Sequence, residues 1–210
     1  MADRPDLLTL LSPKGEEKIN PSTLWGEGKR VRGRRDFRGA TPEYLEMEKV
    51  YIAIGSNKGK REKNIIKALK RMEEAITIKK ISSFFITPPE EGAKGGFFIN
   101  GVIEGKTALP PLKLFLFLQE IEKDIGRPFP HKKGDEREID LDIILYGDRV
   151  IKNSKISIPH PRYRKRYFVI FPLYEIAPDI KDPETEESVS DIYRRLIKNG
   201  GSRKNRRCKE

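Results

Sequence analysis

The stretch that decides the fold is Arg137-Glu138-Ile139-Asp140-Leu141-Asp142-Ile143, which runs on into Ile144-Leu145-Tyr146. Its apolar residues alternate with the two aspartates, and this period of two predicts a half-buried β-strand. Because residues two apart on a strand share a face, Asp140 and Asp142 should point the same way. Two carboxylates side by side on a half-buried sheet repel each other unless cations lie between them.

Carboxylate oxygens are the ligands that Mg²⁺ prefers, and Mg²⁺ usually takes one or two of them and completes its coordination with water and substrate phosphates. A pair of aspartates spaced in this way is more often only a solvated strand face. Three further residues nearby, Arg127, Arg137 and His160, together with the apolar flanks, favour a site for Mg²⁺ and a polyphosphate.

The composition is that of one compact domain with extensions: 210 residues, 36% hydrophobic and 36% charged, with a mean hydropathy of −0.64. No apolar run approaches the roughly 18 residues of a membrane helix, and the N-terminus lacks the basic-then-apolar pattern of a secretory signal. We therefore expect a cytoplasmic protein without a membrane partner. The single Cys208 excludes an intrachain disulfide and a cysteine metal cluster.

The net charge of +11 is unevenly distributed along three parts of the chain. Residues 1–48 mix Gly, Pro and charge and should form a mostly irregular extension, with a start of synthesis at Met47 as a hypothesis. Residues 49–197 should form the domain. Residues 198–210 hold six Lys or Arg against one Glu; such an end either contacts RNA or another polyanion or is a disordered tail, and we expect the tail.

Hydrophobic periodicity and turn signals predict a β-α-β-β-α-β order, the ferredoxin-like arrangement of an α+β fold. The predicted strands are 50–54, 76–87, 97–103 and 139–146, and the predicted helices are 65–76 and 110–126. An additional strand near 155–158 and C-terminal helices at 167–175 and 189–198 follow this core. The glycine turn at 55–59 lacks the pattern of a Walker-type phosphate-binding loop.

A ferredoxin-like fold also serves RNA-binding modules, so the fold alone names no function. An RNA-binding module would need paired aromatic residues on its central strands, and Gly95-Gly96-Phe97-Phe98 matches that motif poorly. A face with two aspartates would also repel phosphates when no metal is bound. RNA binding through the basic surface and tail therefore stays as the alternative, and we do not expect a nucleic-acid partner.

Six short motifs occur in order within residues 49–180, and Phe168, Pro172-Leu173 and Glu175-Ile176-Ala177-Pro178 extend the series. Each motif is weak alone, but in this order they resemble the family of 6-hydroxymethyl-7,8-dihydropterin pyrophosphokinase, an enzyme of folate synthesis. The motifs are Tyr51-Ile52-Ala53-Ile54-Gly55-Ser56-Asn57, Thr87-Pro88-Pro89, Phe98-Ile99-Asn100, Gly126-Arg127, Arg137-Glu138-Ile139-Asp140-Leu141-Asp142-Ile143 and Ile158-Pro159-His160-Pro161-Arg162.

The resemblance implies transfer of a diphosphate from ATP to the hydroxymethyl oxygen of the pterin, with release of AMP. Such transfer relies mainly on positioning and on neutralisation of charge. By likeness to the family, Asp140 and Asp142 hold two Mg²⁺ ions, and Arg127 and Arg137 neutralise phosphate charge. Taken alone, each arginine would more simply form a surface ion pair. These four are the expected catalytic residues, and the expected partners of a monomer are ATP and the pterin.

The resemblance also assigns contacts with the nucleotide. A lone histidine is more often a structural hydrogen bonder, and Gln119 and Glu122 would otherwise be an exposed helix face, but all three match family positions that contact ATP. The residues that we expect to bind ATP are Gln119, Glu122, Arg127, Arg137, Ile143, Lys155, Ser157, His160 and Arg166.

For the pterin, the resemblance implies a ring held between Phe98 and Phe168, where offset stacking adds on the order of 1 kcal/mol each. Without the family, both would be core phenylalanines. Asn100 offers a donor and an acceptor to the edge of the heterocycle, and asparagine is otherwise depleted in strands. The residues that we expect to bind the pterin are Thr87, Pro88, Pro89, Phe98, Asn100, Asp140 and Phe168.

The sequence departs from the family in one loop. Where the family commonly has Gly-Pro before Arg137, this chain has Asp135-Glu136, and Gly134 stands where some members have an aromatic residue. Residues 128–136 are expected to form a lid that closes over ATP. The two added acidic residues predict either looser closure or pairing with Lys132 and Lys133.

Overall fold

The computed structural model of the protein describes residues 47–89, 95–127 and 134–206, with side chains as far as residue 198. The predictions made for residues 1–46, for residues 128–133 of the lid and for residues 207–210 lie outside these ranges. Within them, no helix is both long enough and apolar enough to cross a lipid bilayer.

An antiparallel sheet forms the centre of the domain, and the spatial order of its strands differs from their order in the sequence. Its four main strands are β1 (Glu48–Ser56), β2 (Ile76–Ile81), β4 (Phe98–Thr107) and β5 (Asp140–Tyr146), in the spatial order β2-β4-β1-β5. The helix α2 (Arg61–Met72) links β1 to β2, and α3 (Pro111–Ile125) links β4 to β5. This order confirms the ferredoxin-like prediction, in which two β-α-β units interleave their strands.

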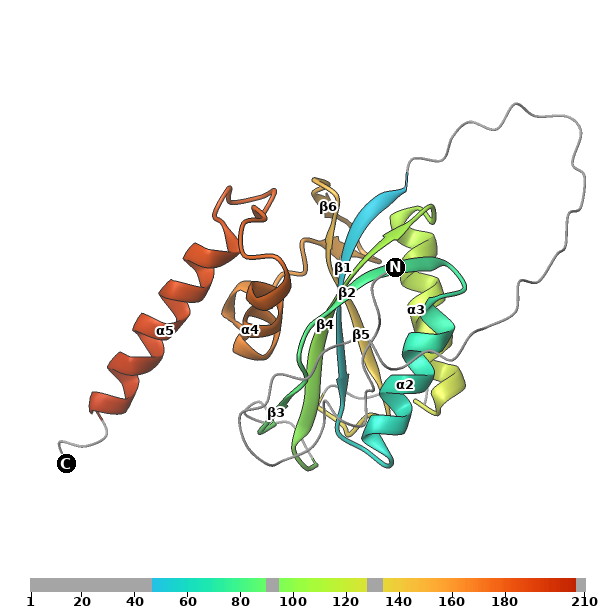
Figure 1. Ribbon diagram of the computed structural model, residues 1–210, viewed down its shortest axis with the longest axis horizontal. Helices are drawn as coiled ribbons and strands as arrows, with labels where there is room; N and C mark the ends of the chain where they lie inside the picture. The colour runs from blue at the N-terminus through green and yellow to red at the C-terminus, as the bar shows by residue number, and fades with distance from the viewer. Residues whose placement is uncertain (1–46, 90–94, 128–133, 207–210) are drawn as a thin grey trace, which may run out of the picture.

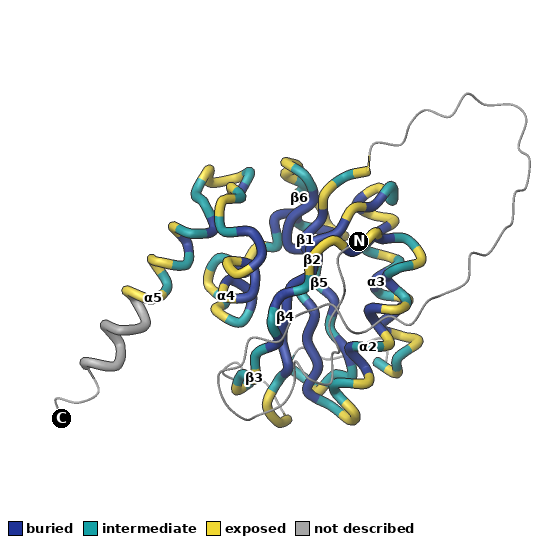
Figure 2. The backbone as a smooth tube through the Cα atoms, in the orientation of Figure 1, coloured by how far each residue is buried: buried dark blue, intermediate teal, exposed yellow. Residues whose placement is uncertain are grey.

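Helices cover both faces of the sheet, as Figure 1 shows: α2 and α3 lie on one side, and α4 (Tyr167–Ile176) lies on the other. The alternation within β1 explains this layering, because Val50, Ile52 and Ile54 pack with α2 and α3, while Tyr51 and Ala53 pack with α4. A strand covered on both faces must be apolar nearly throughout. Figure 2 accordingly shows the buried residues running along β1, β4 and β5.

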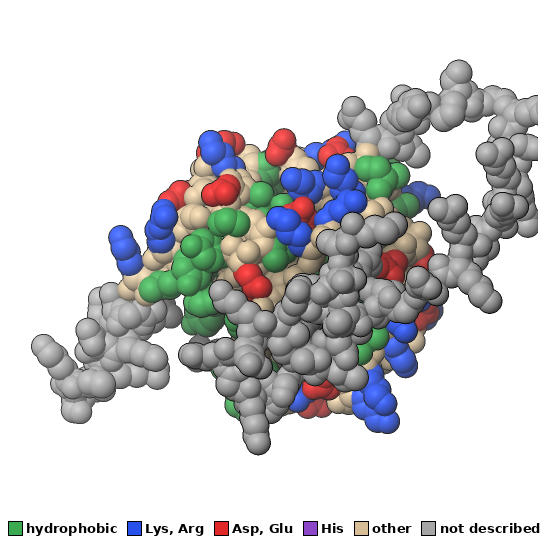
Figure 3. Space-filling model, in the orientation of Figure 1, with side chains coloured by type: hydrophobic (Ala, Val, Ile, Leu, Met, Phe, Trp, Pro, Cys, Tyr) green, Lys and Arg blue, Asp and Glu red, His purple; other side chains and the backbone are tan. Residues whose placement is uncertain are grey.

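The outermost element is α5 (Val189–Arg206), which packs on α4 through aromatic rings. Tyr174 stacks on Tyr193 with ring centroids 4.2 Å apart, and Phe171 meets the same ring edge-on. Hydrophobic side chains are visible over this pair of helices in Figure 3. The helix continues past residue 198, where we expected it to end, because each residue added to an existing helix forms a further backbone hydrogen bond.

The prediction of one continuous strand at 76–87 is wrong. Two strands, β2 and β3 (Phe85–Thr87), both pair with β4 and are separated by Ser82–Phe84. Ser82 still bonds to the backbone of Val102, but the N–H and hydroxyl of Ser83 donate to the carboxylate of Glu175 on α4. Serine side chains compete in this way with ladder hydrogen bonds, and the strand is interrupted.

The strand predicted near 155–158 is present as β7 (Ser157–Ile158), and it pairs with a strand that was not predicted, β6 (Ile151–Lys152). Both are two residues long, too short for hydrophobic periodicity to indicate them. After β7 the chain passes through a single 3₁₀ turn, η1 (Tyr163–Lys165), before entering α4. This connection brings the segment 160–166 over the end of β5.

Candidate active site

The register of the three central strands places the two aspartates on the face covered by α4. Gly55 of β1 lies opposite Asn100 on β4 and opposite Asp140 on β5. Ala53 lies opposite Asp142 in the next row of the same face. The shared orientation that the alternation predicts is therefore found, and Asn100 lies in the same row as Asp140.

Asp140 is held by two arginines. One carboxylate oxygen accepts a hydrogen bond from Arg127 and the other from Arg137, each at 2.7 Å. The Arg127 side chain is 9% exposed and that of Asp140 is 23% exposed, so the pairs are only partly screened by water. The two predicted phosphate-binding arginines thus converge on one predicted metal ligand.

Asp142 faces a histidine and an arginine at a longer distance. His160 Nε2 and Arg166 Nη1 both lie 3.8 Å from its Oδ2 atom, and its side chain keeps 38% of its exposure. Burial of the site and the charge of Asp140 raise the pKa of Asp142, against the opposing effect of the arginines. The neighbouring side chains therefore compensate the negative charge of Asp142 only in part, and a bound cation would stabilise the ionised carboxylate.

Glu122, which was predicted to contact ATP, is directed into the protein. It is 7% exposed, and its Oε1 atom accepts hydrogen bonds from Arg127 and from the backbone N–H of Leu141. Burial raises the pKa of Glu122 to about 7, although the Arg127 charge opposes the shift. These contacts link α3 to β5 and hold Arg127 beside Asp140.

His160 has a fixed orientation at the end of β5. Its backbone N–H donates to the carbonyl of Ile144 at 3.0 Å, and its Nδ1 atom accepts from the backbone N–H of Arg162 at 3.2 Å. Burial, with Arg166 and Arg162 nearby, lowers the pKa of His160 to about 4. The ring is therefore neutral at physiological pH, with its proton on Nε2, the atom that faces Asp142.

The turn after β1 has a role that sequence reasoning missed. Asn57 and Arg137 bond to each other twice, through Asn57 N–H to Arg137 O at 3.2 Å and Arg137 N–H to Asn57 Oδ1 at 2.8 Å. Ser56 and Asn64 both donate to the carbonyl of Glu138. The sequence did contain a signal, because Ser56, Asn57 and Asn64 stand next to apolar residues expected in the core. Buried polar groups need hydrogen-bond partners, and these three find them in the backbone of residues 137 and 138.

A second group of predicted residues gathers beside the aspartates. Asn100 is 7% exposed and donates its amide to Thr87 Oγ1 at 2.8 Å. The absence of a side chain at Gly55 makes room for it, because a Cβ there would lie 2.6 Å from Asn100 Oδ1. Phe98 and Phe168 are both half-buried, and Arg166 lies over the ring of Phe168 at 5.3 Å.

The remaining residues predicted to bind ATP or the pterin differ in their exposure. Gln119 is half-buried on α3, and the side chain of Ile143 points into the core beneath α2 and α3, away from the aspartates. Lys155 is exposed before β7, and Ser157 is half-buried within it. Pro88 and Pro89 end the described segment that follows β3; Pro88 is exposed and Pro89 half-buried.

The donor set fits Mg²⁺ with a substrate. Across the described ranges there is no group of three or more His, Cys, Asp or Glu residues that could hold a metal ion by themselves. Two carboxylates on one face, one of them with surplus charge, suit an ion that completes its coordination with water and substrate phosphates. Asp140 and Asp142 are the residues that would hold it.

Paired carboxylates among cationic side chains are an arrangement of phosphoryl-transfer enzymes, and together with the sheet they define a transferase of ferredoxin-like fold. Comparison with known proteins identifies the group within that class. Residues 51–178 match the family model described as 7,8-dihydro-6-hydroxymethylpterin-pyrophosphokinase. The chain belongs to this family of enzymes.

Individual relatives agree with the family match. An Aquifex aeolicus protein named 2-amino-4-hydroxy-6-hydroxymethyldihydropteridine pyrophosphokinase is 40% identical over 152 residues, which cover 72% of this chain and 89% of that protein. The protein of the same name from Bacillus subtilis is 36% identical over 64% of this chain and 81% of its own length.

Solved structures agree on the fold. A crystal structure of Plasmodium falciparum HPPK-DHPS with pteroate superposes with a TM-score of 0.63 at 14% identity. The match covers 76% of this chain but only 46% of that chain, so this chain spans less than half of the Plasmodium protein. This likeness concerns the fold alone.

Proposed function

We propose that this chain transfers a diphosphate group from ATP to the hydroxymethyl oxygen of 6-hydroxymethyl-7,8-dihydropterin in folate biosynthesis. The hydroxymethyl oxygen forms a bond to the β-phosphorus, the bond between that phosphorus and the bridging oxygen of the α-phosphate breaks, and AMP leaves. The hydroxyl proton is released to solvent. The observation that carries the proposal is the convergence of Arg127, Arg137, His160 and Arg166 on the Asp140–Asp142 pair.

The four cationic or hydrogen-bonding side chains would bind the triphosphate. Arg127 and Arg137 present planar guanidinium groups that match phosphate oxygens and neutralise their charge. Neutral His160 donates from Nε2 without adding a proton-dependent charge. Arg166 lies beside it on the same carboxylate. When bound by Asp140 and Asp142, two Mg²⁺ ions would neutralise phosphate charge and polarise the attacking hydroxyl.

Glu122 would support this phosphate site from behind. Its carboxylate fixes Arg127 and the start of β5, so its proposed contribution to ATP binding is through the arginine. Gln119, Ile143, Lys155 and Ser157 complete the proposed nucleotide contacts, Ile143 through its backbone. The proposed role of these four residues rests on the family resemblance alone.

The pterin would lie beside the phosphate site, where Asn100 stands in the same row as Asp140. The Asn100 amide, oriented by Thr87, would bond to the edge of the heterocycle, with Pro88 and Pro89 closing that side. Phe98 and Phe168 supply aromatic faces on β4 and α4. This arrangement would hold the hydroxymethyl group next to Asp140.

The proposal is tested by mixing the purified full chain with ATP, Mg²⁺ and 6-hydroxymethyl-7,8-dihydropterin and separating the nucleotides. AMP should form in equal amount to the pterin diphosphate, and no AMP should form without the pterin. ADP as the nucleotide product, or hydrolysis that does not need the pterin, would contradict the proposal. Asp140→Asn should abolish turnover, and Asp148→Asn, the same change at an exposed position after β5, should not.

The alternative, an RNA-binding module, makes a different prediction. It requires tight, salt-sensitive binding of oligonucleotides that survives deletion of residues 198–210. RNA-binding modules of this fold stack bases on an open sheet face. Here α4 packs on that face of β4, which leaves no open central surface among the described elements.

A further inference from the structure

The turn between β7 and α4 carries two of the proposed phosphate ligands. His160 stands at its start and Arg166 at its end, and each lies 3.8 Å from Asp142 Oδ2. The backbone between them is closed by two hydrogen bonds, from Tyr163 N–H to His160 O at 3.2 Å and from Arg166 N–H to Tyr163 O at 3.0 Å. Tyr163 therefore sets the spacing between the two ligands.

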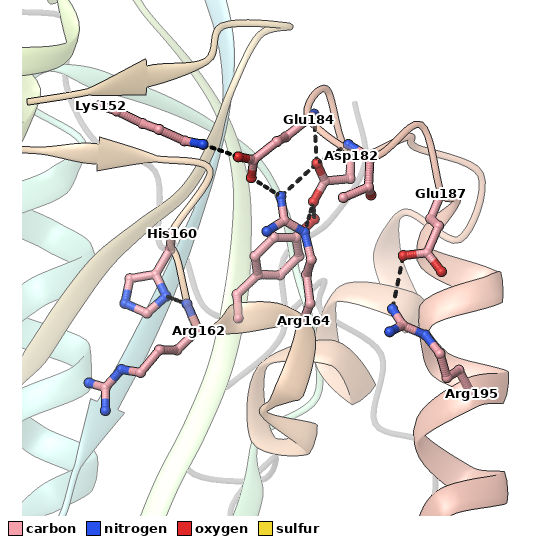
Figure 4. A network of polar contacts seen from close by, with 10 residues as sticks. Lys152, His160, Arg162, Arg164, Asp182, Glu184, Glu187 and Arg195 are labelled. Atoms are coloured by element: carbon pink, nitrogen blue, oxygen red, sulfur yellow. Dashed lines mark hydrogen bonds and ion pairs between the residues drawn. The ribbon is translucent and has the colours of Figure 1, made fainter.

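Tyr163 and its neighbour Arg164 are both held by one aspartate, Asp182, on the connection between α4 and α5. Asp182 is fully buried, and so is Tyr163. The Tyr163 hydroxyl donates to Asp182 Oδ2 at 2.5 Å, while Arg164 donates through Nε to Oδ2 and through Nη2 to Oδ1 at 2.8 Å. Figure 4 shows Arg164 turned toward Asp182 and Glu184.

The position of Asp182 is fixed independently of the turn that it holds. Its Oδ1 atom also accepts from the backbone N–H groups of Glu184 at 2.7 Å and Thr185 at 3.1 Å. Its own N–H donates to the carbonyl of Glu187 at 2.9 Å, and Glu186 takes a positive φ of 58° to close this loop. A carboxylate with five donors around it has little freedom to move.

The same network gives the two arginines of the turn different partners. Arg164 is taken up by Asp182 and by Glu184, which also pairs with Lys152 on β6. Arg166, two residues further on, is directed to Asp142. The buried aspartate therefore binds one guanidinium of the turn, while the other faces Asp142.

We propose that Asp182 is a positioning residue for nucleotide binding: it holds Tyr163 and Arg164 so that His160 and Arg166 meet the ATP phosphates at a fixed spacing. It touches neither the aspartate pair nor any proposed substrate contact and acts only through the turn. This role rests on the proposed function, because it assumes that His160 and Arg166 bind ATP.

The test compares Asp182→Asn with Asp148→Asn, the same chemical change at an exposed position after β5. Asn keeps the shape of Asp but places an N–H₂ group against donors of Tyr163 or Arg164. For Asp182→Asn, KM for ATP and the Kd for a non-hydrolysable ATP analogue should rise about tenfold, the effect of losing one charge-assisted contact. KM for the pterin should not change, and Asp148→Asn should match the wild type throughout.

Tyr163→Phe provides a milder second variant, because it removes only the hydroxyl and keeps the buried ring. It should raise KM for ATP about threefold, in line with one hydrogen bond, and circular dichroism should confirm that it folds. A merely structural role would lower the yield of folded enzyme and leave KM for ATP unchanged. An unchanged KM for ATP in Tyr163→Phe and in folded Asp182→Asn would overturn the positioning role.

The two proposals fail in different ways. A wild-type chain that binds the ATP analogue but releases no AMP refutes the transfer reaction, and the affinity of the variants for the analogue still decides the role of Asp182. A wild-type chain that binds no ATP analogue refutes the nucleotide site itself, and the positioning role falls with it.

Discussion

Two aspartate–arginine networks lie on the α4 side of the sheet, one around Asp182 and one around the Asp140–Asp142 pair. Asp182 is fully buried and accepts five hydrogen bonds from the protein. Asp142 keeps 38% of its side-chain exposure, and His160 and Arg166 stay 3.8 Å from its Oδ2 atom. Similar residue types are therefore arranged once as a closed network and once as an open one.

The pKa values of the two networks shift in opposite directions. Burial acts to raise the pKa of Asp182, but the hydrogen bonds from Arg164, Tyr163 and the backbone outweigh it, and the pKa is lowered. At Asp142, burial and the neighbouring Asp140 charge prevail over the arginines, and the pKa is raised. Asp182, whose carboxylate accepts five hydrogen bonds from the protein, stabilises the fold, whereas Asp142, whose neighbours His160 and Arg166 stay 3.8 Å away, is suited to bind a cation.

The largest effect should come from the open network. Asp142→Asn should lower turnover by roughly 10²–10³-fold, the range seen when one electrostatic contact to a transition state is removed. Its stability should be equal to or higher than that of the wild type, because the repulsion from Asp140 is gone. AMP formation and urea unfolding measure the two quantities. A variant that loses stability as well as activity would show that Asp142 belongs with the closed network.

The closed network should show the reverse pattern. Asp182→Asn should lower the free energy of unfolding by about 3 kcal/mol at pH 7, because it removes the buried counter-charge of the half-buried Arg164 guanidinium, which keeps Glu184 as its remaining ion-pair partner. Urea unfolding followed by far-UV circular dichroism measures this, with Asp148→Asn as the exposed control. Equal stability of Asp182→Asn and the wild type would mean that the network contributes no net stabilisation.

The sequence predicted the open site better than the closed one. Period-two alternation placed Asp140 and Asp142 on one face because side-chain direction in a strand depends only on local geometry. Two partners of Asp182, Arg164 and Tyr163, lie 18 and 19 residues before it in the chain, with the whole of α4 in between. Such contacts depend on tertiary placement, for which neither periodicity nor a local motif gives a signal.

The same distinction explains the errors within the fold. The order of the main strands and helices followed from hydrophobic periodicity, but the break at Ser82–Phe84 depends on Glu175, a residue on a distant helix. The inward orientation of Glu122 depends in the same way on the backbone N–H of Leu141, 19 residues further along the chain. Residues whose role is fixed by a distant partner were the ones that the sequence did not predict.

A smaller effect is expected at the pterin end of the open site. In Gly55→Ala, the new Cβ would lie 2.6 Å from Asn100 Oδ1 and would push the amide away from Thr87. KM for the pterin should rise about tenfold, as for the loss of a well-placed hydrogen bond, while KM for ATP stays the same. Gly96→Ala, where no atom of the described residues lies within 4 Å of the new Cβ, should leave both constants unchanged.

The smallest effect concerns pH and the closed network. Because the pKa of Asp182 is lower in the folded chain than the value of about 3.9 in an unfolded one, its ionised form stabilises the fold fully above that value. This stabilisation is lost as the pH falls through the folded pKa. The groups facing it do not titrate in this range, since the pKa values of Tyr163 and Arg164 are raised further above neutrality.

The difference in unfolding free energy between the wild type and Asp182→Asn should therefore be constant from about pH 8 to pH 5 and shrink below about pH 4. Glu184, whose pKa is lowered by Lys152 and Arg164, titrates in both proteins and largely cancels in the comparison. Urea unfolding at pH 7, 5 and 3 measures the difference. If it stayed constant down to pH 3, the charge of Asp182 would not be what stabilises the network, and the contrast with Asp142 would have to rest on hydrogen-bond geometry alone.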